Sequence, residues 1–330
     1  MRNITFKGLL LTAVFMLLGC LSIQAANDDL ITKQITIKLD KAGTLPDRIA
    51  SSKKYKITNL KLVGEINGTD WNMIREMAGR NYQESSTEGN LSVLDLSEAK
   101  IVAGGDYYYD DNLFNNKVYT SNDEIGEYAF AYCSGLTSLT LPVGITSIGE
   151  FAFSGCSGLT SLTLPAGITS IGEYAFSGCS GLTSLTLPAG ITSIGKYAFS
   201  GCSRLTSLTL PAGITSIGEF AFSYCSGLTS IYVYAEKVPR IGRYAFEGCA
   251  SRKCTLYVPK GTYDNYRLSE FGYFENIVEF DATGIDKTTT STDVEEVSRY
   301  SADGQRLAVP VKGLNIVKYS DGSARKVVVK

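Results

Sequence analysis

The sequence contains no histidine, and this absence excludes several kinds of catalytic and metal site. Ser-His and Cys-His nucleophile pairs need an imidazole, and so do histidine-ligated metal sites. Charge is also sparse, because only 19% of the residues are charged and the net charge is -2. A chain without a basic excess lacks the electrostatic attraction on which nucleic-acid binding depends. We therefore expect no nucleic-acid partner. An enzyme could still work with Asp, Glu, Lys and Tyr alone, but we expect no catalytic residues, no metal and no cofactor.

Long apolar runs are missing as well. The longest candidate, 9–18, follows two basic residues, is too short to span a bilayer and is typical of an export signal. The sequence is compatible with two cleavage sites. The letters LLGC at 17–20 resemble a lipobox, which predicts lipidation of Cys20, whereas Ala25 and Ala26 predict ordinary signal-peptide cleavage. Either way we expect an exported protein, as an outer-membrane lipoprotein at the cell surface or as a secreted protein.

A unit of 23 residues repeats through the middle of the chain. Gly158–Ser180 and Gly181–Ser203 agree at 22 of 23 positions, and the single difference places Lys196 where the previous unit has Glu173. A fixed period of this length is typical of a solenoid. One unit buries too little apolar surface to offset the entropy of ordering its backbone, so stability has to come from stacking. Nearly identical units favour such stacking because their shapes are equal.

Each unit has the form LTSLTLPxGITSIGxxAFxxC and predicts two short strands. Leu139 and Leu141 alternate with polar residues, which is the period of a strand with one buried face. Pro142 lacks an N–H group and ends this strand. Residues 146–148 predict a second, shorter strand. The apolar spacing then changes, and we expect a single helical turn from Phe151 to Gly155.

One cysteine recurs in each unit. Equivalent sulfurs of neighbouring coils should lie about 4.8 Å apart and point the same way, whereas a disulfide needs about 2.05 Å and converging side chains. We therefore predict buried free thiols, with a metal–thiolate ladder as the alternative. The cysteines concerned are Cys133, Cys156, Cys179, Cys202 and Cys225. Cys249 and Cys254 break the ladder, and a disulfide between them is left open.

The repeats carry a family resemblance. Leu136, Leu139 and Leu141 match leucine-rich repeats, but Gly144 stands where the commonest form has Asn or Cys. The pattern LPxGITSIGxxAFxxC resembles instead the BspA-like repeats of Bacteroidetes surface proteins, in six copies from Glu124 to about Cys249. The resemblance implies a right-handed leucine-rich-repeat superhelix of short parallel β-strands and helical turns. It also implies a surface protein that adheres to host proteins or to other microbes.

The resemblance extends to both ends of the repeats. Segments starting at Ile57 and Leu91 look like irregular coils, with a helix at 69–79, and Thr255–Phe280 looks like a closing strand and cap. The expected division is a signal peptide at 1–26 (or a lipoprotein signal ending before Cys20), an N-terminal cap with irregular repeats at 27–123, regular repeats with their cap at 124–280, a Thr-rich linker at 281–295 and a C-terminal β module at 296–330.

The C-terminal module starts a new pattern. Asp-Gly pairs at 303–304 and 321–322 lie between alternating runs and predict hairpin turns. Val311–Tyr319 should pair with Ala324–Val329 as antiparallel strands. The module resembles the C-terminal sorting modules of type IX secretion in Bacteroidetes. A small β-domain without a sorting role is the alternative.

Two periodic surfaces are candidates for binding. An aromatic residue recurs beside a charge that changes sign, which indicates that both lie near water. We predict that the aromatic rings stack at about 4.8 Å and stabilise the solenoid, and the alternative is that they contact a partner. This candidate stripe consists of Tyr128, Phe151, Tyr174, Tyr197, Phe220 and Tyr244, with Glu173 and Lys196 beside it. We expect Lys196 to pair with Glu173 and Glu219 and so to relieve like charge along the row.

The second candidate surface is the exposed side of the longer strands. Ser138, Thr140 and their copies should form ladders of hydroxyl groups, which either support the sheet or dock a partner. The acidic segment Gly104–Lys117 interrupts the repeats. Its Asp106, Asp110, Asp111 and Asn112 have Ca²⁺-binding oxygens, but their spacing fits no standard loop and indicates a solvated insertion.

Together these features favour a non-enzymatic recognition or adhesion protein. It would bind host or microbial proteins or glycans through its repeat faces. The alternative is a structural spacer or surface-lattice protein that displays another module. We find no cluster of unlike residues in the repeats of the kind that an enzyme site needs.

Overall fold

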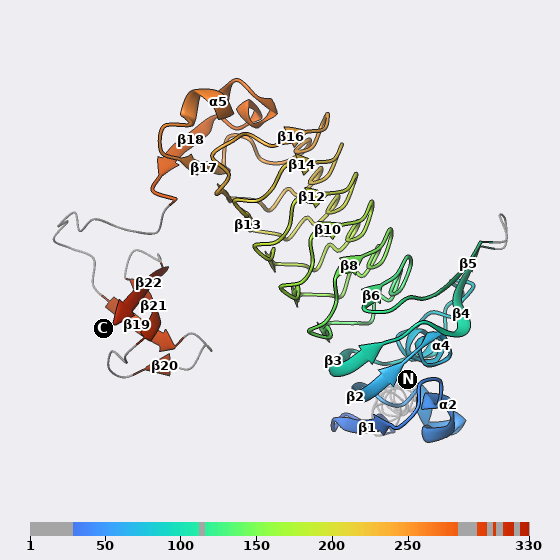
Figure 1. The fold of residues 1–330 in the computed structure, drawn as a ribbon. Coiled ribbons are helices and arrows are strands. Elements are labelled where there is room, and N and C mark those ends of the chain that lie inside the picture. Colours follow the sequence, from blue (N-terminus) through green and yellow to red (C-terminus); the bar gives the residue numbers. More distant parts are fainter. Residues whose placement is uncertain are drawn as a thin grey trace, which may run out of the picture. The chain divides into compact units, whose positions relative to one another are not determined.

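The computed structural model describes residues 29–111, 116–282, 296–301, 306–307, 313–319 and 324–329 (Figure 1). The export signal with Cys20, most of the predicted linker and the two Asp-Gly pairs of the tail lie outside the described residues. The chain forms two compact units, Met1–Glu279 and Phe280–Lys330. In the described part of the chain, no helix has the length and apolar content required to cross a bilayer.

The first unit begins with irregular coils. Parallel strands β1 (Ile35–Leu39), β2 (Asn59–Ile66) and β3 (Val93–Ile101) lie side by side and continue into the regular repeats. Short helices α2 (Leu45–Arg48) and α3 (Ser51–Lys54) connect β1 to β2. Helix α4 (Gly68–Met77) is the helix expected at 69–79, and a capping box at Asn67 and Asp70 begins it.

The regular coils contribute two strands each, as the alternation predicted. The longer strands form one side of the solenoid: β7 (Ser138–Thr140), β9 (Ser161–Thr163), β11 (Ser184–Thr186), β13 (Ser207–Leu210) and β15 (Ser230–Val233). The shorter strands form a continuous six-stranded parallel sheet: β6 (Glu124–Ile125), β8 (Ser147–Ile148), β10 (Ser170–Ile171), β12 (Ser193–Ile194), β14 (Ser216–Ile217) and β16 (Arg240–Ile241).

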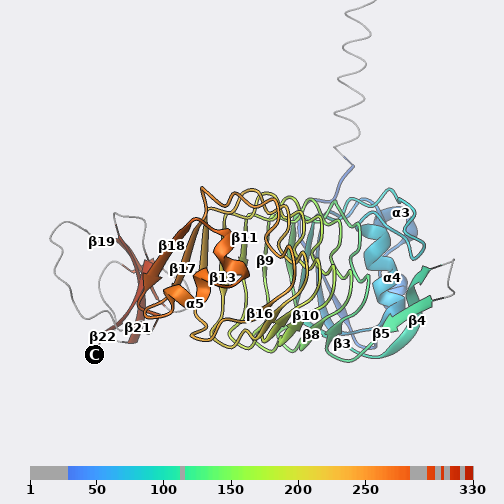
Figure 2. The same cartoon turned by 90° about the horizontal axis from the view of Figure 1, so that it is seen from above.

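Register follows the repeat. Ser161 pairs with Ser184 and Ile171 with Ile194, so chemically identical residues are neighbours across coils. Figure 2 shows these coils lying side by side, with α4 at one end. The ladder of longer strands is divided, because β1, β2, β3, β7, β9 and β11 form one sheet and β13 begins another. The Thr206 N–H donates to the Thr183 carbonyl at 3.3 Å across this division.

The third side of each coil corrects one prediction. Phe151–Gly155 is a series of turns and not a helical turn, because alternate N–H groups bond to the next coil, while that of Ser154 bonds within the turn to the Phe151 carbonyl at 3.0 Å. The N–H groups of Phe151, Phe153 and Gly155 donate to the carbonyls of Glu173, Ala175 and Ser177 at 3.0, 2.7 and 2.7 Å. Phe151 and Gly155 adopt left-handed φ values of 53° and 71°. The turns therefore form a third hydrogen-bonded ladder between coils.

A column of phenylalanines fills the centre of the solenoid. Their rings stack at 4.9–5.6 Å and each is at most 3% exposed. The members are Phe130, Phe153, Phe176, Phe199, Phe222 and Phe246. Trp71 of α4 covers the first ring at 5.2 Å, and Phe271 and Phe274 cover the last at 5.3 and 5.2 Å. The core is thus closed at both ends by aromatic side chains.

The cysteines are confirmed as buried free thiols, including Cys249 and Cys254. They also have a role that the sequence did not reveal. Each thiol from Cys156 onward in the repeats donates to a phenylalanine carbonyl of the preceding coil, for example Cys179 Sγ to Phe153 O at 3.1 Å. The thiol is therefore both a small apolar group and a weak hydrogen-bond donor between coils.

Side chains of the N-terminal cap replace the donors of a missing coil. Within the repeats, turn carbonyls accept N–H groups of the preceding coil. In the first coil, the Glu127 carbonyl accepts the Tyr108 hydroxyl at 2.9 Å, and the Ala129 carbonyl accepts the Trp71 indole N–H at 2.9 Å and the buried Arg75 guanidinium at 3.1 Å. The cap thereby satisfies buried carbonyls that would otherwise destabilise the end of the solenoid.

Glycine is required where the coils come closest. A Cβ atom built at Gly195 would lie 2.6 Å from the backbone carbon of Gly172, and the same approach recurs at Gly149, Gly172 and Gly218. This explains the glycine of the SIG triplet. The turn glycine of the same coil differs, since a Cβ at Gly190 would lie 3.5 Å from its nearest neighbours.

The C-terminal cap contains the expected closing strand. It consists of β17 (Thr255–Pro259), α5 (Tyr263–Arg267), the 3₁₀ helix η1 (Glu270–Tyr273) and β18 (Asn276–Phe280). In the second unit, β19 (Glu296–Ser301), β20 (Arg306–Leu307), β21 (Gly313–Tyr319) and β22 (Ala324–Val329) form an antiparallel sheet. The predicted pairing is confirmed, with Leu314 opposite Val328.

The glycine contacts predict a difference between two identical substitutions in one coil. We expect Gly195→Ala to lower the free energy of unfolding by about 1–3 kcal/mol, because its methyl group forces neighbouring coils apart. Gly190→Ala is the matched control and should change it by less than about 0.5 kcal/mol. Urea unfolding followed by circular dichroism measures both. Equal effects would show that coil spacing does not limit the first position.

The thiols predict a loss of stability in alkali. Burial raises the pKa of Cys179 from 9.0 to about 12 and that of Cys254 to about 11. The unfolded chain releases these protons first, so their stabilisation is complete below about pH 9 and is lost as the pH rises toward about 12. We expect the urea midpoint to fall between about pH 9 and 11, and less steeply in Cys179→Ala. A midpoint independent of pH over this range would contradict the assignment.

Candidate functional site

The predicted aromatic stripe forms a continuous stack on the turn side of the solenoid. The rings of Phe151, Tyr174, Tyr197 and Phe220 lie 4.7–4.8 Å apart and are nearly parallel, with interplanar angles of 5–7°. Tyr128 extends the stack at 4.9 Å from Phe151. The predicted spacing of about 4.8 Å is therefore confirmed.

The ends of the stripe differ. Tyr109, from the strand before the repeats, covers Tyr128 at 4.0 Å with an interplanar angle of 1°. At the other end Tyr244 is tilted by 28° against Phe220 and is 58% exposed, whereas the rings between them are half-buried. Neighbouring rings cover one another's faces along the stripe. Its water-facing surface therefore consists mainly of ring edges.

The charges beside the stripe lie in water, as their variation predicted. Glu173, Lys196 and Glu219 are exposed, and Glu150 is half-buried. Burial, together with the negative charges of Glu173 and Glu127, raises the pKa of the Glu150 carboxyl. Like charges along this row therefore do disfavour one another, and a lysine at one position reduces that repulsion.

A proposed detail of this row is wrong. Lys196 was expected to pair with Glu173 and Glu219, but no ion pair joins it to either carboxylate in the described structure. The physical reason is exposure. An ion pair between solvated side chains contributes only about 0–1 kcal/mol to stability, and it restricts the motion of two flexible side chains. The three side chains remain available for contacts with another molecule.

The hydroxyl groups of the longer strands divide into two sets. Thr160, Thr183 and Thr206, at the strand entrances, donate to threonine carbonyls of the preceding coil at 3.1–3.3 Å. The hydroxyl groups on the exposed side of β7, β9 and β11 form the second set. They point to water and make no hydrogen bond to another described residue. These are Ser138, Thr140, Ser161, Thr163, Ser184 and Thr186. Sequence periodicity alone did not distinguish the two sets.

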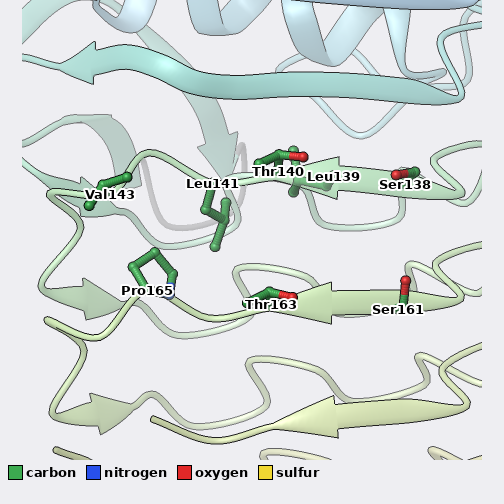
Figure 3. A pocket seen from close by; sticks show the side chains of 8 residues that line it. All are labelled: Ser138, Leu139, Thr140, Leu141, Val143, Ser161, Thr163 and Pro165. Carbon is green, nitrogen blue, oxygen red and sulfur yellow. The ribbon is translucent and has the colours of Figure 1, made fainter. Parts of the chain in front are cut away.

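The hydroxyl face has a hollow at its N-terminal end. A cavity of about 330 Å³ lies over β7 and β9, and Figure 3 shows Ser138, Thr140, Ser161 and Thr163 along these strands. Val143 and Pro165 line the end of the hollow. Val143 is 79% exposed and replaces the alanine of the next three coils. This one substitution is the sequence signal that could have located the hollow.

The hydroxyl face ends at different groups on its two sides. The Thr140 row continues in register to Asp95, which forms an ion pair with Lys61 at 3.3 Å. Toward the other end, Tyr232 is in register with Thr209 and stacks on Tyr257 at 4.4 Å. The face is therefore uncharged between a charged and an aromatic boundary.

The acidic segment before the repeats forms a hairpin of β4 (Gly104–Asp111) and β5 (Asn116–Thr120). Several of its residues are exposed, as the expected solvated insertion requires, but Tyr108 and Tyr109 are buried. Asp106 bonds to Thr69 at 2.9 Å, and buried Tyr108 packs against Trp71. The hairpin therefore caps the solenoid. Asn112 lies outside the described residues, and among those described no three His, Cys, Asp or Glu side chains gather as metal ligands.

Comparison with solved structures found several bacterial proteins, among them leucine-rich repeat proteins. A leucine-rich repeat protein of T. pallidum is 25% identical over 46% of this chain and 78% of its own length, with a TM-score of 0.34. A leucine-rich cell surface protein of Faecalibacterium prausnitzii is 22% identical over 62% and 49%, with a TM-score of 0.31. The pneumococcal vaccine antigen PcpA is 15% identical over 75% and 68%, with a TM-score of 0.41.

The family comparison concerns the repeats themselves. Residues 109–253 match the model of the BspA type leucine-rich repeat region in six copies. A search of the curated proteins gave no match. The matched range contains the turn ladder, the cysteine column and the aromatic stripe described above. Residues 109–253 of this chain therefore belong to the BspA-type leucine-rich repeat family.

Proposed function

We propose that this protein recognises a partner at the cell surface and has no enzymatic activity. The aromatic stripe is the observation that carries the proposal. It offers half-buried ring edges in a straight row beside exposed charges of both signs. Aromatic side chains that are already ordered lose little entropy when another protein covers them, and they are frequent anchors of interfaces.

The geometry of the rings favours a protein over a glycan as the partner. A sugar stacks on the face of an aromatic ring, but faces within the stripe are covered by neighbours at 4.7–4.9 Å. Ring edges and charges of both signs suit the apolar and polar side chains of a protein surface. Host or microbial proteins are thus the proposed partners, and a glycan is the alternative.

Export supports a surface role. The apolar run at 9–18 predicts passage out of the cytoplasm, either with a lipid on Cys20 or after ordinary cleavage. The BspA-type repeats agree with this location, as does the description of the Faecalibacterium protein as a cell surface protein. The C-terminal module is proposed to assist sorting.

A structural spacer is the second candidate. Three hydrogen-bonded ladders and two aromatic columns make the repeat stack stiff, and the aromatic caps close its core at both ends. Such a stack would hold a neighbouring module at a fixed distance without binding anything. The two candidates differ in whether the repeat surface has a ligand.

Replacing rings of the stripe tests the recognition function. We expect the combined change of Tyr174, Tyr197 and Phe220 to Ser to weaken partner binding at least tenfold, because aromatic anchors often contribute about 2 kcal/mol or more. Candidate partners are captured from host and microbial surface proteins and measured by surface plasmon resonance, with a glycan array alongside.

Two controls accompany this measurement. Tyr174→Phe combined with Tyr197→Phe keeps the stack and should bind normally, and Ser184→Ala with Thr186→Ala tests the hydroxyl face. Circular dichroism establishes that each variant is folded. Unchanged affinity in the folded serine variant would reject the stripe as the binding surface, and absence of any micromolar ligand would favour the spacer.

A further inference from the structure

The N-terminal cap contains a cavity that collects unlike residues, which the repeats do not. Its volume is about 340 Å³, and it is formed by α2, α3, α4 and the hairpin strand β4. Pro46, Ile49 and Met73 supply an apolar wall, and the last two are each 6% exposed. Lys54, Asn72, Glu76 and Asp106 supply polar groups. None of these residues has an equivalent in the regular coils.

Asp106 places a carboxylate at the cavity in a fixed position. Its Oδ2 accepts the Thr69 hydroxyl at 2.9 Å, and its backbone N–H donates to the same hydroxyl at 3.1 Å. These two bonds use only one carboxylate oxygen. The other oxygen makes no hydrogen bond within the described residues and is available as an acceptor.

Asn72 lines the cavity, but its unpaired acceptor is covered. Its Nδ2 donates to the Tyr107 carbonyl at 2.7 Å, which fixes the orientation of the amide. The Oδ1 atom is then buried and has no hydrogen-bond partner. Because this atom has almost no surface that water can reach, a ligand in the cavity does not contact it, and the accessible acceptors of the site are carboxylate oxygens.

The cavity also has an excess of negative charge. Glu76 and Asp106 provide two carboxylates. Among the described residues that line the cavity, Lys54 is the single cation, and its ammonium bonds to one oxygen of Glu76. The Lys54 ammonium also lies 4.7 Å from the centre of the Tyr55 ring. One negative charge therefore remains uncompensated beside an apolar wall.

We propose that this cavity binds a guanidinium group on an aliphatic stem, as in an arginine side chain. A guanidinium presents several N–H donors in one plane and is less strongly hydrated than an ammonium, so it can reach separated acceptors at a smaller desolvation cost. The carboxylate oxygens of Asp106 and Glu76 that Thr69 and Lys54 do not use accept its N–H groups. The stem lies on Ile49 and Met73. This site is independent of the aromatic stripe and of the function proposed for it.

Two small probes of equal shape test the charge requirement. Butylguanidine and butylurea have the same stem, but only the first is a cation. We expect the full chain to bind butylguanidine with a millimolar Kd, as suits so small a ligand. Butylurea should bind at least tenfold more weakly. Saturation-transfer NMR and calorimetry measure both, and equal binding of the two probes would overturn the proposal.

Substitutions of opposite expected effect locate the site. Asp106→Asn keeps an oxygen for Thr69 but removes the charge, and should weaken butylguanidine binding roughly tenfold. Lys54→Met removes the competing ammonium and should strengthen it severalfold. Asp264→Asn, on the exposed surface of α5, is the matched control and should have no effect. Unchanged affinity in a folded Asp106→Asn variant would also overturn the proposal.

The source of the guanidinium group is tested with two further probes. Blocked arginine, acetylated and N-methylamidated, represents a residue within a polypeptide, whereas free arginine represents a small metabolite. Binding of the blocked form at least as tightly as the free form supports a partner's side chain. A preference for free arginine supports a small-molecule ligand at the same site, and failure of both to bind better than butylurea rejects the site.

Discussion

The backbone hydrogen bond between equivalent positions of neighbouring coils is the interaction on which this structure depends. It occurs on three sides of each coil, in two strand ladders and in the turn ladder that Phe151, Phe153 and Gly155 represent. It fixes the distance between coils. That distance in turn stacks the rings, requires glycine at position 195 and keeps equivalent thiols too far apart to form disulfides. The aromatic stripe and the hydroxyl face repeat at this same spacing.

Much of the repeat architecture could be predicted because it is a local consequence of periodicity. The alternation around Leu139 predicts a strand, the 23-residue period predicts stacking, and stacking predicts both the ring spacing and the free thiols. The turn from Phe151 was predicted wrongly. Apolar spacing does not reveal whether an N–H group bonds within its own coil or to the next one, and here the neighbouring coil supplies the acceptors.

The sites were less predictable than the fold. The stripe was found because its residues recur, but the covering of its ring faces follows only from three-dimensional stacking. The cap cavity was missed because Lys54, Asn72 and Asp106 lie far apart in an aperiodic sequence, and α4 and the hairpin bring them together. Information that could distinguish one ligand from another is concentrated in these irregular segments.

The equal shape of the coils has a consequence for how this chain can change. On the side of the shorter strands, each regular coil presents the same ladder to both of its neighbours, as the pairing of Ile194 with both Ile171 and Ile217 illustrates. The gain or loss of one whole repeat would therefore join surfaces that already fit. Recombination between the nearly identical gene segments could lengthen or shorten the stack in whole steps, while both caps and the cavity beside α4 keep their structures.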